Sequence, residues 1–242
     1  MFAFGPQFFY TIHMIYFSHR GANTQRVQNT VAAFMLAHEQ GARCFELDVH
    51  LLKDGKLAVH HDYSLLASTG VDVKLADLTS ADLMQFPLRN SFNNQPAYIP
   101  LLQDVLPVVI PGLILLNIEL KNDDNCYPGI EEVVCKSIPE LIKGRVLFSS
   151  FDYACLQRLR ALAPKARIGL LTRKFEISQA LQLRAESVHI NQTRFEPSIA
   201  QICHTHGLKV YCYTVNKTEE AARLATQGVD GIFTDVPALF IS

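Results

Sequence analysis

Two short stretches of this sequence hold residues whose types and spacing could carry out acid–base and metal chemistry. One is Ser18-His19-Arg20-Gly21, and the other is Glu46-Leu47-Asp48 with His60-His61-Asp62 further along. The two carboxylates are two residues apart in an apolar run, so a strand would direct both to one face. Histidine changes charge near neutral pH and can give or take a proton. These groups together are the equipment for metal-assisted cleavage of a phosphodiester.

A hairpin would bring the carboxylates and the histidines together. The segment Lys53-Asp54-Gly55-Lys56 contains an Asp-Gly pair, which is typical of a two-residue turn. Pairing Lys53 with Lys56 places His61 opposite Asp48, with Cβ atoms about 4.5–5.5 Å apart. A three-residue loop would shift the register by one residue and place His60 there instead. We favour the two-residue turn, but geometry alone leaves the choice of histidine open.

Further charged residues lie at the end of the next predicted strand. Glu119 and Lys121 follow an apolar run, so Glu119 would join Glu46 and Asp48 at the carboxyl ends of the strands. Three carboxylates there suit one hard divalent cation, Mg²⁺ or Ca²⁺. The alternative is a network of salt bridges with Lys121 and Arg20, and the nearby histidines argue against it. Arg20 also offers a planar fork that matches a phosphate.

Two residues near the C-terminus are weaker candidates. Tyr213 follows an apolar run and could supply an aromatic wall to a pocket. Asp235 also follows a strand-like run, and it would either cap the last helix or make a contact at the rim of the site.

The length and composition predict one large domain with almost no net charge. The chain has 242 residues, 49% of them hydrophobic, and a formal net charge of −1. It therefore has no general attraction for nucleic acid or a membrane surface. Six cysteines without a Cys-x-x-Cys pair predict free, mostly buried thiols in the cytoplasm. We interpret the apolar residues 1–13 as an N-terminal extension that is not a stable membrane anchor. The alternative is that they make a weak contact with a membrane surface.

Strand-like and helix-like segments alternate along the chain, which predicts a parallel sheet. Eight strands with intervening helices in a chain of this length predict an α/β fold, the (β/α)8 TIM barrel. A helix is expected to start at Asn29-Thr30, and Asn216 is expected to cap another with Glu219 as its partner. The expected strands cover residues 15–18, 44–49, 114–120, 146–149, 168–171, 187–190, 209–215 and 231–234, with 57–61 as the returning arm of the hairpin.

One interval is too long for an ordinary connection between barrel strands. It predicts an insertion, about 63–112, over the mouth of a barrel domain that covers residues 14–242. The segment 79–83 predicts a short helix within it. Such an insertion could shape the substrate pocket or serve only as a structural cap.

At this point the sequence resembles the glycerophosphodiester phosphodiesterase family, as a bacterial-type, small single-domain member. The matching segments follow the family's order from residue 14 almost to the end. They are His19-Arg20-Gly21, Asn29-Thr30, Glu46-Leu47-Asp48-Val49, Lys53-Asp54-Gly55, His61-Asp62, Ile118-Glu119-Leu120-Lys121, Thr214-Val215-Asn216 and Gly231-Ile232-Phe233-Thr234-Asp235.

The resemblance implies a TIM barrel of the phospholipase C-like phosphodiesterase type. It implies one divalent cation, Mg²⁺ or Ca²⁺, on Glu46, Asp48 and Glu119. It assigns acid–base roles to His19 and His61, and so selects His61 over His60. Arg20 and Lys121 are implied as phosphate contacts, and Tyr213 stands where the family has a tryptophan of the pocket.

The implied reaction is hydrolysis of a small glycerophosphodiester to glycerol 3-phosphate and an alcohol, in lipid and glycerol metabolism. The expected protein is a cytoplasmic monomer or homodimer without nucleic acid as a partner. Gln28 replaces a usual glutamate, and a usual arginine is missing from residues 65–69, which bears on substrate preference. The alternatives are a related phosphodiesterase acting on lysophospholipids, of the lysophospholipase D kind, and a non-catalytic barrel that binds phosphodiesters.

Overall fold

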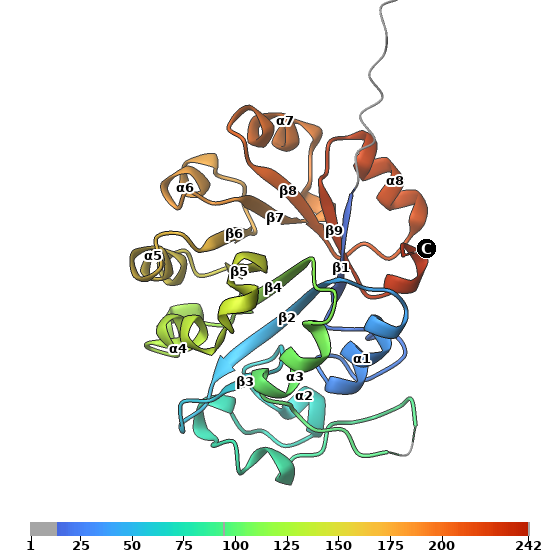
Figure 1. Ribbon diagram of the computed structural model, residues 1–242, viewed down its shortest axis with the longest axis vertical. Helices are drawn as coiled ribbons and strands as arrows, with labels where there is room; N and C mark the ends of the chain where they lie inside the picture. The colour runs from blue at the N-terminus through green and yellow to red at the C-terminus, as the bar shows by residue number, and fades with distance from the viewer. Residues whose placement is uncertain (1–13, 94, 242) are drawn as a thin grey trace, which may run out of the picture.

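Eight parallel strands pair side by side until the last strand returns to the first (Figure 1). The computed structural model describes residues 14–93 and 95–241. Strand β1 pairs with both β2 and β9, and this closes the barrel. The ring contains, in order, β1 (Ile15–His19), β2 (Cys44–Leu51), β4 (Leu115–Leu120), β5 (Val146–Ser150), β6 (Arg167–Thr172), β7 (Ser187–Asn191), β8 (Lys209–Tyr213) and β9 (Gly231–Thr234). The predicted TIM barrel is confirmed.

Helices connect the strands and form the outer layer of the barrel (Figure 1). They are α1 (Val31–Glu39), α3 (Leu102–Val109), α4 (Ile130–Ser137), α5 (Tyr153–Leu162), α6 (Ile177–Gln182), α7 (Pro197–Thr205) and α8 (Thr218–Thr226), whereas the short helix α2 (Leu66–Thr69) lies outside this layer, in the predicted insertion. Helix α1 starts where expected, because the Thr30 hydroxyl accepts a hydrogen bond from the Ala33 amide at 3.2 Å. The predicted cap of α8 by Asn216 is wrong: Lys217 stands at the cap position, and the Asn216 side chain binds Asp235 instead.

Successive side chains of a strand point to opposite faces, so the barrel strands contribute to two separate cores, one between strands and helices and one inside the barrel. In β2, Phe45 and Leu47 pack outward against the helices, while Glu46 and Asp48 lie on the opposite face, toward the barrel interior. The lower interior holds a separate apolar cluster that includes Phe17, Tyr211 and Phe233. The rings of Phe17 and Phe233 stack with centroids 4.7 Å apart. Apolar side chains therefore fill the lower part of the barrel interior, and the charged residues lie above them, toward the carboxyl ends of the strands.

The hairpin has a three-residue loop, so the preferred two-residue register is wrong. Strand β3 (Leu57–Val59) runs antiparallel to β2, with Leu51 opposite Leu57 and Val49 opposite Val59. Gly55 has φ +77°, a conformation suited to such a loop. The amide of Lys53 donates to the Leu78 carbonyl at 2.9 Å instead of pairing with Lys56. A distant segment therefore helps to set the loop.

That segment belongs to a subdomain with a hydrophobic cluster of its own, outside the ring and next to β3 (Figure 1). The cluster is made of Leu52, Ala58, Leu65, Leu75, Leu78, Leu83, Leu88 and Ile99. Helix α3 lies within the predicted insertion but packs against α1 in the outer layer. The predicted helix at 79–83 is not formed; Asp82 accepts hydrogen bonds from the amide and hydroxyl of Thr79, and a 3-10 turn follows at Leu83–Gln85.

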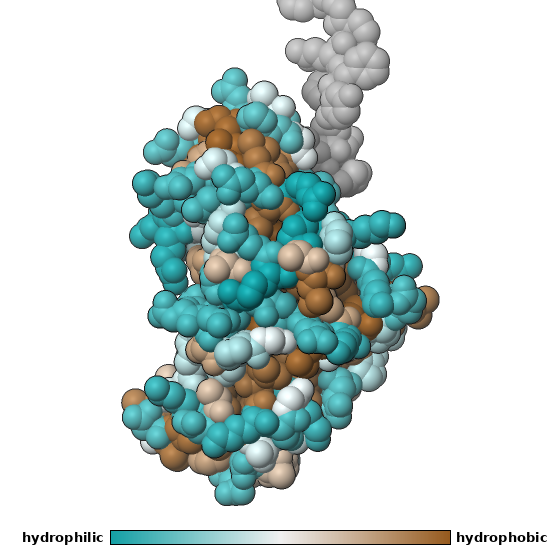
Figure 2. All heavy atoms as spheres, turned by 90° about the vertical axis from the view of Figure 1, so that its left-hand side faces the viewer, coloured by the Kyte–Doolittle hydropathy of each residue, from teal (hydrophilic) through white to brown (hydrophobic). Residues whose placement is uncertain are grey.

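The outer surface is mixed. Figure 2 shows that the face carrying α4, α5 and α6 is mainly hydrophilic, with apolar surface in separate patches. All six cysteines are free, and Cys44, Cys155, Cys203 and Cys212 are buried. Among the helices of the described residues, none is long and apolar enough to cross a membrane. The predicted extension, residues 1–13, lies outside the described residues.

Candidate active site

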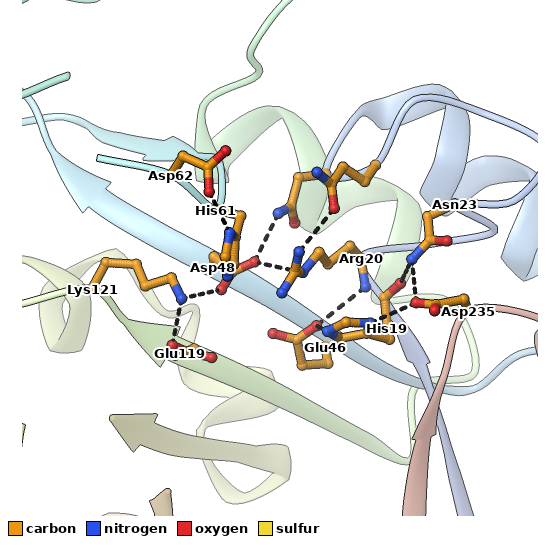
Figure 3. A network of polar contacts seen from close by, with 12 residues as sticks. His19, Arg20, Asn23, Glu46, Asp48, His61, Asp62, Glu119, Lys121 and Asp235 are labelled. Atoms are coloured by element: carbon orange, nitrogen blue, oxygen red, sulfur yellow. Dashed lines mark hydrogen bonds and ion pairs between the residues drawn. The ribbon is translucent and has the colours of Figure 1, made fainter. Parts of the chain in front are cut away.

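A cavity of about 210 Å³ opens at the carboxyl ends of the barrel strands. We call it the barrel cavity. Figure 3 shows its charged side chains converging from β1, β2 and β4 and from the segment after β3. It is lined by His19, Arg20, Glu46, His61, Asn117, Glu119, Lys121, Phe151, Leu171, His189, Tyr213, Thr214 and Phe233.

Three buried carboxylates lie together beside this cavity. One ligand oxygen from each of Glu46, Asp48 and Glu119 lies within 4.8 Å of the other two. Burial and the negative charge of Asp48 raise the pKa of Glu46 well above its usual value. Burial likewise raises the pKa of Glu119. Burial acts on Asp48 in the same direction, but Lys121 and Arg20 outweigh it and hold the pKa of Asp48 far below its usual range.

Two cations flank Asp48 (Figure 3). Arg20 Nε lies 3.1 Å from Asp48 Oδ2, and Lys121 Nζ lies 3.1 Å from Asp48 Oδ1. Lys121 Nζ also donates to Glu119 Oε1 at 2.6 Å. Arg20 stands at the end of β1 with φ +58°, and its amide donates to the Glu46 carbonyl at 3.0 Å. The turn after β1 thus fixes the guanidinium next to the carboxylates.

The acidic cluster fits a divalent cation. Three carboxylates face two cations, which leaves an excess of negative charge in a buried place. Asp48 Oδ1 is buried and accepts no hydrogen bond, although Lys121 is near it. Carboxylate oxygens are the ligands that Mg²⁺ and Ca²⁺ prefer. A cation at this place would offset the excess charge and give Asp48 Oδ1 a partner in addition to Lys121.

His19 is held by an aspartate from the other end of the fold. Its Nδ1 lies 2.7 Å from Asp235 Oδ1, and its Nε2 lies 3.9 Å from Glu46 Oε2. Asp235 also accepts from the amides of Asn23 and Asn216, at 2.6 and 2.7 Å. Although burial opposes ionisation, these hydrogen bonds hold the pKa of Asp235 well below its usual range. An ionised carboxylate only accepts, so the His19 proton lies on Nδ1 and Nε2 is free toward the cavity.

His61 reaches the barrel cavity from the segment that follows β3. Its Nδ1 lies 2.6 Å from Asp62 Oδ1, and burial lowers its pKa. The buried ring of His50 supports it from behind, because His50 Nε2 lies 3.3 Å from the His61 carbonyl and Nδ1 lies 2.9 Å from the Tyr127 hydroxyl. Strand pairing ends at Val59, so the turn of the chain directs His61, and not His60, to this cavity.

The remaining wall of the barrel cavity is aromatic. Tyr213 lies edge-on to Phe151, with ring centroids 6.1 Å apart, as a candidate pocket wall should. Sequence reasoning missed Phe151 and Asn117 and left the role of Asp235 open. Asn117 is buried, and its side chain donates to the Ser149 hydroxyl at 2.9 Å. The sequence could have indicated Asn117, because it stands two residues before Glu119 and so lies on the same face of β4.

A second cavity, of about 420 Å³, lies between the site and the insertion. We call it the insertion-side cavity. It shares His19 and Arg20 with the barrel cavity, and these two residues stand where the cavities meet. Its other lining residues are Asn23, Val27, Gln28, His60, Ala67, Ser68, Leu88, Arg89, Phe92 and Asp235.

Polar residues at the carboxyl ends of a closed parallel barrel define a TIM-barrel enzyme, since active sites of this fold lie at that face. The sequence matches the glycerophosphoryl diester phosphodiesterase family over residues 19–239. The chain belongs to this family of phosphoric diester hydrolases, which confirms the resemblance and the enzyme class.

Relatives and solved structures agree with this assignment. A glycerophosphodiester phosphodiesterase of Caldanaerobacter subterraneus subsp. tengcongensis is 35% identical over 231 residues, which cover 93% of this chain and 95% of the relative. One from Bacillus altitudinis is 36% identical over 230 residues, covering 91% and 94%. The structure of an Oleispira antarctica phosphodiesterase in complex with the product sn-glycerol-3-phosphate superposes with a TM-score of 0.83 at 29% identity, covering 93% and 94%.

Proposed function

We propose that the protein hydrolyses glycerophosphodiesters to glycerol 3-phosphate and an alcohol, with one divalent cation, in the breakdown of glycerophospholipids. The observation that carries this proposal is that His19 and His61 line the same cavity as two members of the carboxylate cluster, Glu46 and Glu119. The Oleispira antarctica relative holds sn-glycerol-3-phosphate as its product, which supports the glycerol side of the substrate.

The metal ligands in this proposal are Glu46, Asp48 and Glu119, and the cation is Mg²⁺ or Ca²⁺. When bound, it polarises the phosphoryl oxygens and makes the phosphorus more reactive. Arg20 and Lys121 hold positive charge at the same place, in ion pairs with Asp48. Both can stabilise the negative charge that grows on the phosphoryl oxygens in the transition state.

Proton transfer is assigned to His19 and His61. One imidazole takes a proton from the nucleophile while the new phosphorus–oxygen bond forms. The nucleophile is either water, which gives glycerol 3-phosphate directly, or the substrate's glycerol 2-hydroxyl, which gives a cyclic phosphate that water then opens. The other protonates the oxygen of the departing alcohol as its bond to phosphorus breaks. Asp235 orients His19 and Asp62 orients His61 for these transfers. Tyr213 bounds the pocket that receives the glycerol unit.

Chelation tests the metal assignment. We expect EDTA to abolish the release of glycerol 3-phosphate from glycerophosphocholine, and added Mg²⁺ or Ca²⁺ to restore it. Glu119→Gln should weaken metal binding in calorimetric titration, because it removes one anionic ligand. Glu140→Gln is the matched control, since Glu140 is 86% exposed and far from the cluster in its salt bridge with Lys143. Full turnover in EDTA would contradict the proposal.

The proposed catalytic domain covers residues 14–242, with 1–13 as an extension and the insertion shaping the pocket. We infer a cytoplasmic reaction from the six free cysteines, which a reducing compartment would keep as thiols. The proposed partner is the small-molecule substrate, and the proposed state is a monomer or homodimer without nucleic acid or a stable membrane anchor. Lysophosphatidylcholine belongs in the same assay, where we expect it to be the poorer substrate.

A further inference from the structure

The two cavities together could hold the two halves of one phosphodiester. They meet at His19 and Arg20, where the proposed function places the phosphoryl group. The barrel cavity is the smaller, at about 210 Å³, and the glycerol unit is assigned to it. The insertion-side cavity is twice as large, at about 420 Å³, and it is the remaining space for the alcohol. The following inference therefore rests on the proposed function.

Most charged groups lining the insertion-side cavity are already satisfied. Arg20 lies against Asp48 and donates to Gln28 Oε1 at 2.9 Å. Asp235 accepts hydrogen bonds from His19 and two asparagine side chains. Arg89, by contrast, forms no ion pair with any carboxylate within residues 14–93 and 95–241. It is the unmatched charge of this cavity among those residues.

Arg89 is an exposed residue of the insertion, and its backbone and side chain each make one hydrogen bond there. Its amide donates to the Ser68 carbonyl at 2.7 Å, and its Nη1 donates to the Ala67 carbonyl at 3.3 Å. Its guanidinium lies over Gly70, where a Cβ atom would come within 2.8 Å of Nη2. A guanidinium has five N–H donors, so most of them stay available to a ligand. Asn23, Gln28 and Ser68 add polar groups to the same wall.

We propose that the insertion-side cavity receives the leaving alcohol and that Arg89 selects alcohols carrying an anionic group, such as a carboxylate, over those carrying only an ammonium group. A guanidinium binds a carboxylate through two parallel hydrogen bonds. A choline or ethanolamine group would bring its positive charge toward Arg89. Asp235 could not compensate fully, since its oxygens already accept three side-chain hydrogen bonds.

Glycerophosphoserine and glycerophosphoethanolamine make a matched test, because they differ only by one carboxylate. We expect wild type to have the higher kcat/KM for glycerophosphoserine. Arg89→Gln should lower the ratio of the two kcat/KM values roughly three- to tenfold, the range for a partly exposed charged hydrogen bond. Arg89→Lys should keep part of the preference. Arg184→Gln is the control, since Arg184 is exposed and lines neither cavity.

The ratio separates selection from a structural role. If Arg89 only held α2 in place within the insertion, the activity on both substrates would fall equally and the ratio would stay constant. A constant ratio in Arg89→Gln, or a wild-type preference for glycerophosphoethanolamine, would overturn the inference. If neither compound is hydrolysed with Mg²⁺ or Ca²⁺, the proposed function fails. Calorimetric binding of both compounds to wild type and Arg89→Gln then decides the selectivity by itself.

Discussion

The two candidate catalytic histidines are held in different surroundings. The His19 side chain is 14% exposed and bonded to Asp235, whereas the His61 side chain is 35% exposed and bonded to Asp62, which is itself 41% exposed. Burial lowers the pKa of both, which favours the neutral imidazole that a general base needs, and the histidine that acts as the acid must take up a proton before the alcohol leaves. The more exposed His61 can exchange its proton with solvent more readily than the enclosed His19.

Removing either imidazole should cost turnover and leave the fold intact. We expect His19→Ala and His61→Ala each to lower kcat at least about 100-fold, the lower end for general acid–base catalysis. The measurement is release of glycerol 3-phosphate at saturating metal, with circular dichroism as a check on folding. His206→Ala is the control, because His206 is exposed and lies outside both cavities. A histidine whose loss leaves near-normal turnover has no part in the chemistry.

At the scale of elements, β7 carries a histidine that the proposed mechanism leaves unused. His189 is fully buried between the rings of Tyr211 and Phe233, with centroids 5.2 and 5.1 Å away. Its Nε2 lies 2.8 Å from the Ser187 hydroxyl, and its ring lies over Gly169, where a Cβ atom would come within 2.4 Å. Burial lowers its pKa to about 3. The barrel therefore requires this side chain to be neutral.

This histidine makes folding stability depend on pH. Unfolded His189 binds a proton below its ordinary pKa of 6.5, but the folded form does not until about 3. The free energy of unfolding should therefore fall with pH below 6.5, by up to about 1.4 kcal/mol per pH unit from this residue. His189→Gln should flatten that slope in urea titrations at pH 7.5, 6 and 5, compared with His206→Gln. Equal slopes in both variants would contradict the assignment.

The strands were predictable because most are short, largely apolar segments with buried residues on both faces, such as Leu115–Leu120, which is apolar apart from Asn117 and Glu119. The hairpin register was not, because a hydrogen bond from Lys53 to Leu78 and the contact of Asp54 with Ser80 help to set its loop. Neither contact can be predicted from the residues of the hairpin alone, because each partner lies more than 20 residues further along the chain. The role expected of Asn216 failed for the same reason, since its partner is Asp235 on the following strand connection.

At the scale of the molecule, the hydrophobic interior is divided between the barrel and the insertion. Leu116 belongs to the large cluster between strands and helices, and Leu75 belongs to the cluster under the insertion; both are fully buried. The two regions meet around β3, through residues such as Leu52 and Ala58. Because each has a hydrophobic cluster of its own, we expect the insertion to open without the barrel unfolding.

Matched leucine substitutions should reveal this division. Loss of a buried leucine costs about 2–5 kcal/mol. We expect Leu75→Ala to speed proteolytic cleavage within residues 63–101 while the urea midpoint of the barrel changes little. Leu116→Ala should lower that midpoint. If Leu75→Ala lowers it equally and leaves the insertion resistant to protease, the two regions unfold as one unit.

The candidate ligands and histidines could be located from sequence because each stands within or just after a strand that the apolar pattern predicts. The partnership of His19 with Asp235 could not, because the two residues are 216 positions apart and meet only in the closed barrel. Arg89 was overlooked for a similar reason. Only the folded insertion brings it to Ala67 and Gly70, beside the site.

Closure of the ring through β1 and β9 has a consequence for synthesis of the protein. Strand β1 leaves the ribosome early, yet one of its edges stays unpaired until residues 231–234 are added. His19 cannot meet Asp235 before that moment. A nascent chain that already holds the residues of the acidic cluster would thus still lack the contact that orients His19. Activity would begin only when translation has passed residue 235, so turnover reports that both ends of the barrel have joined.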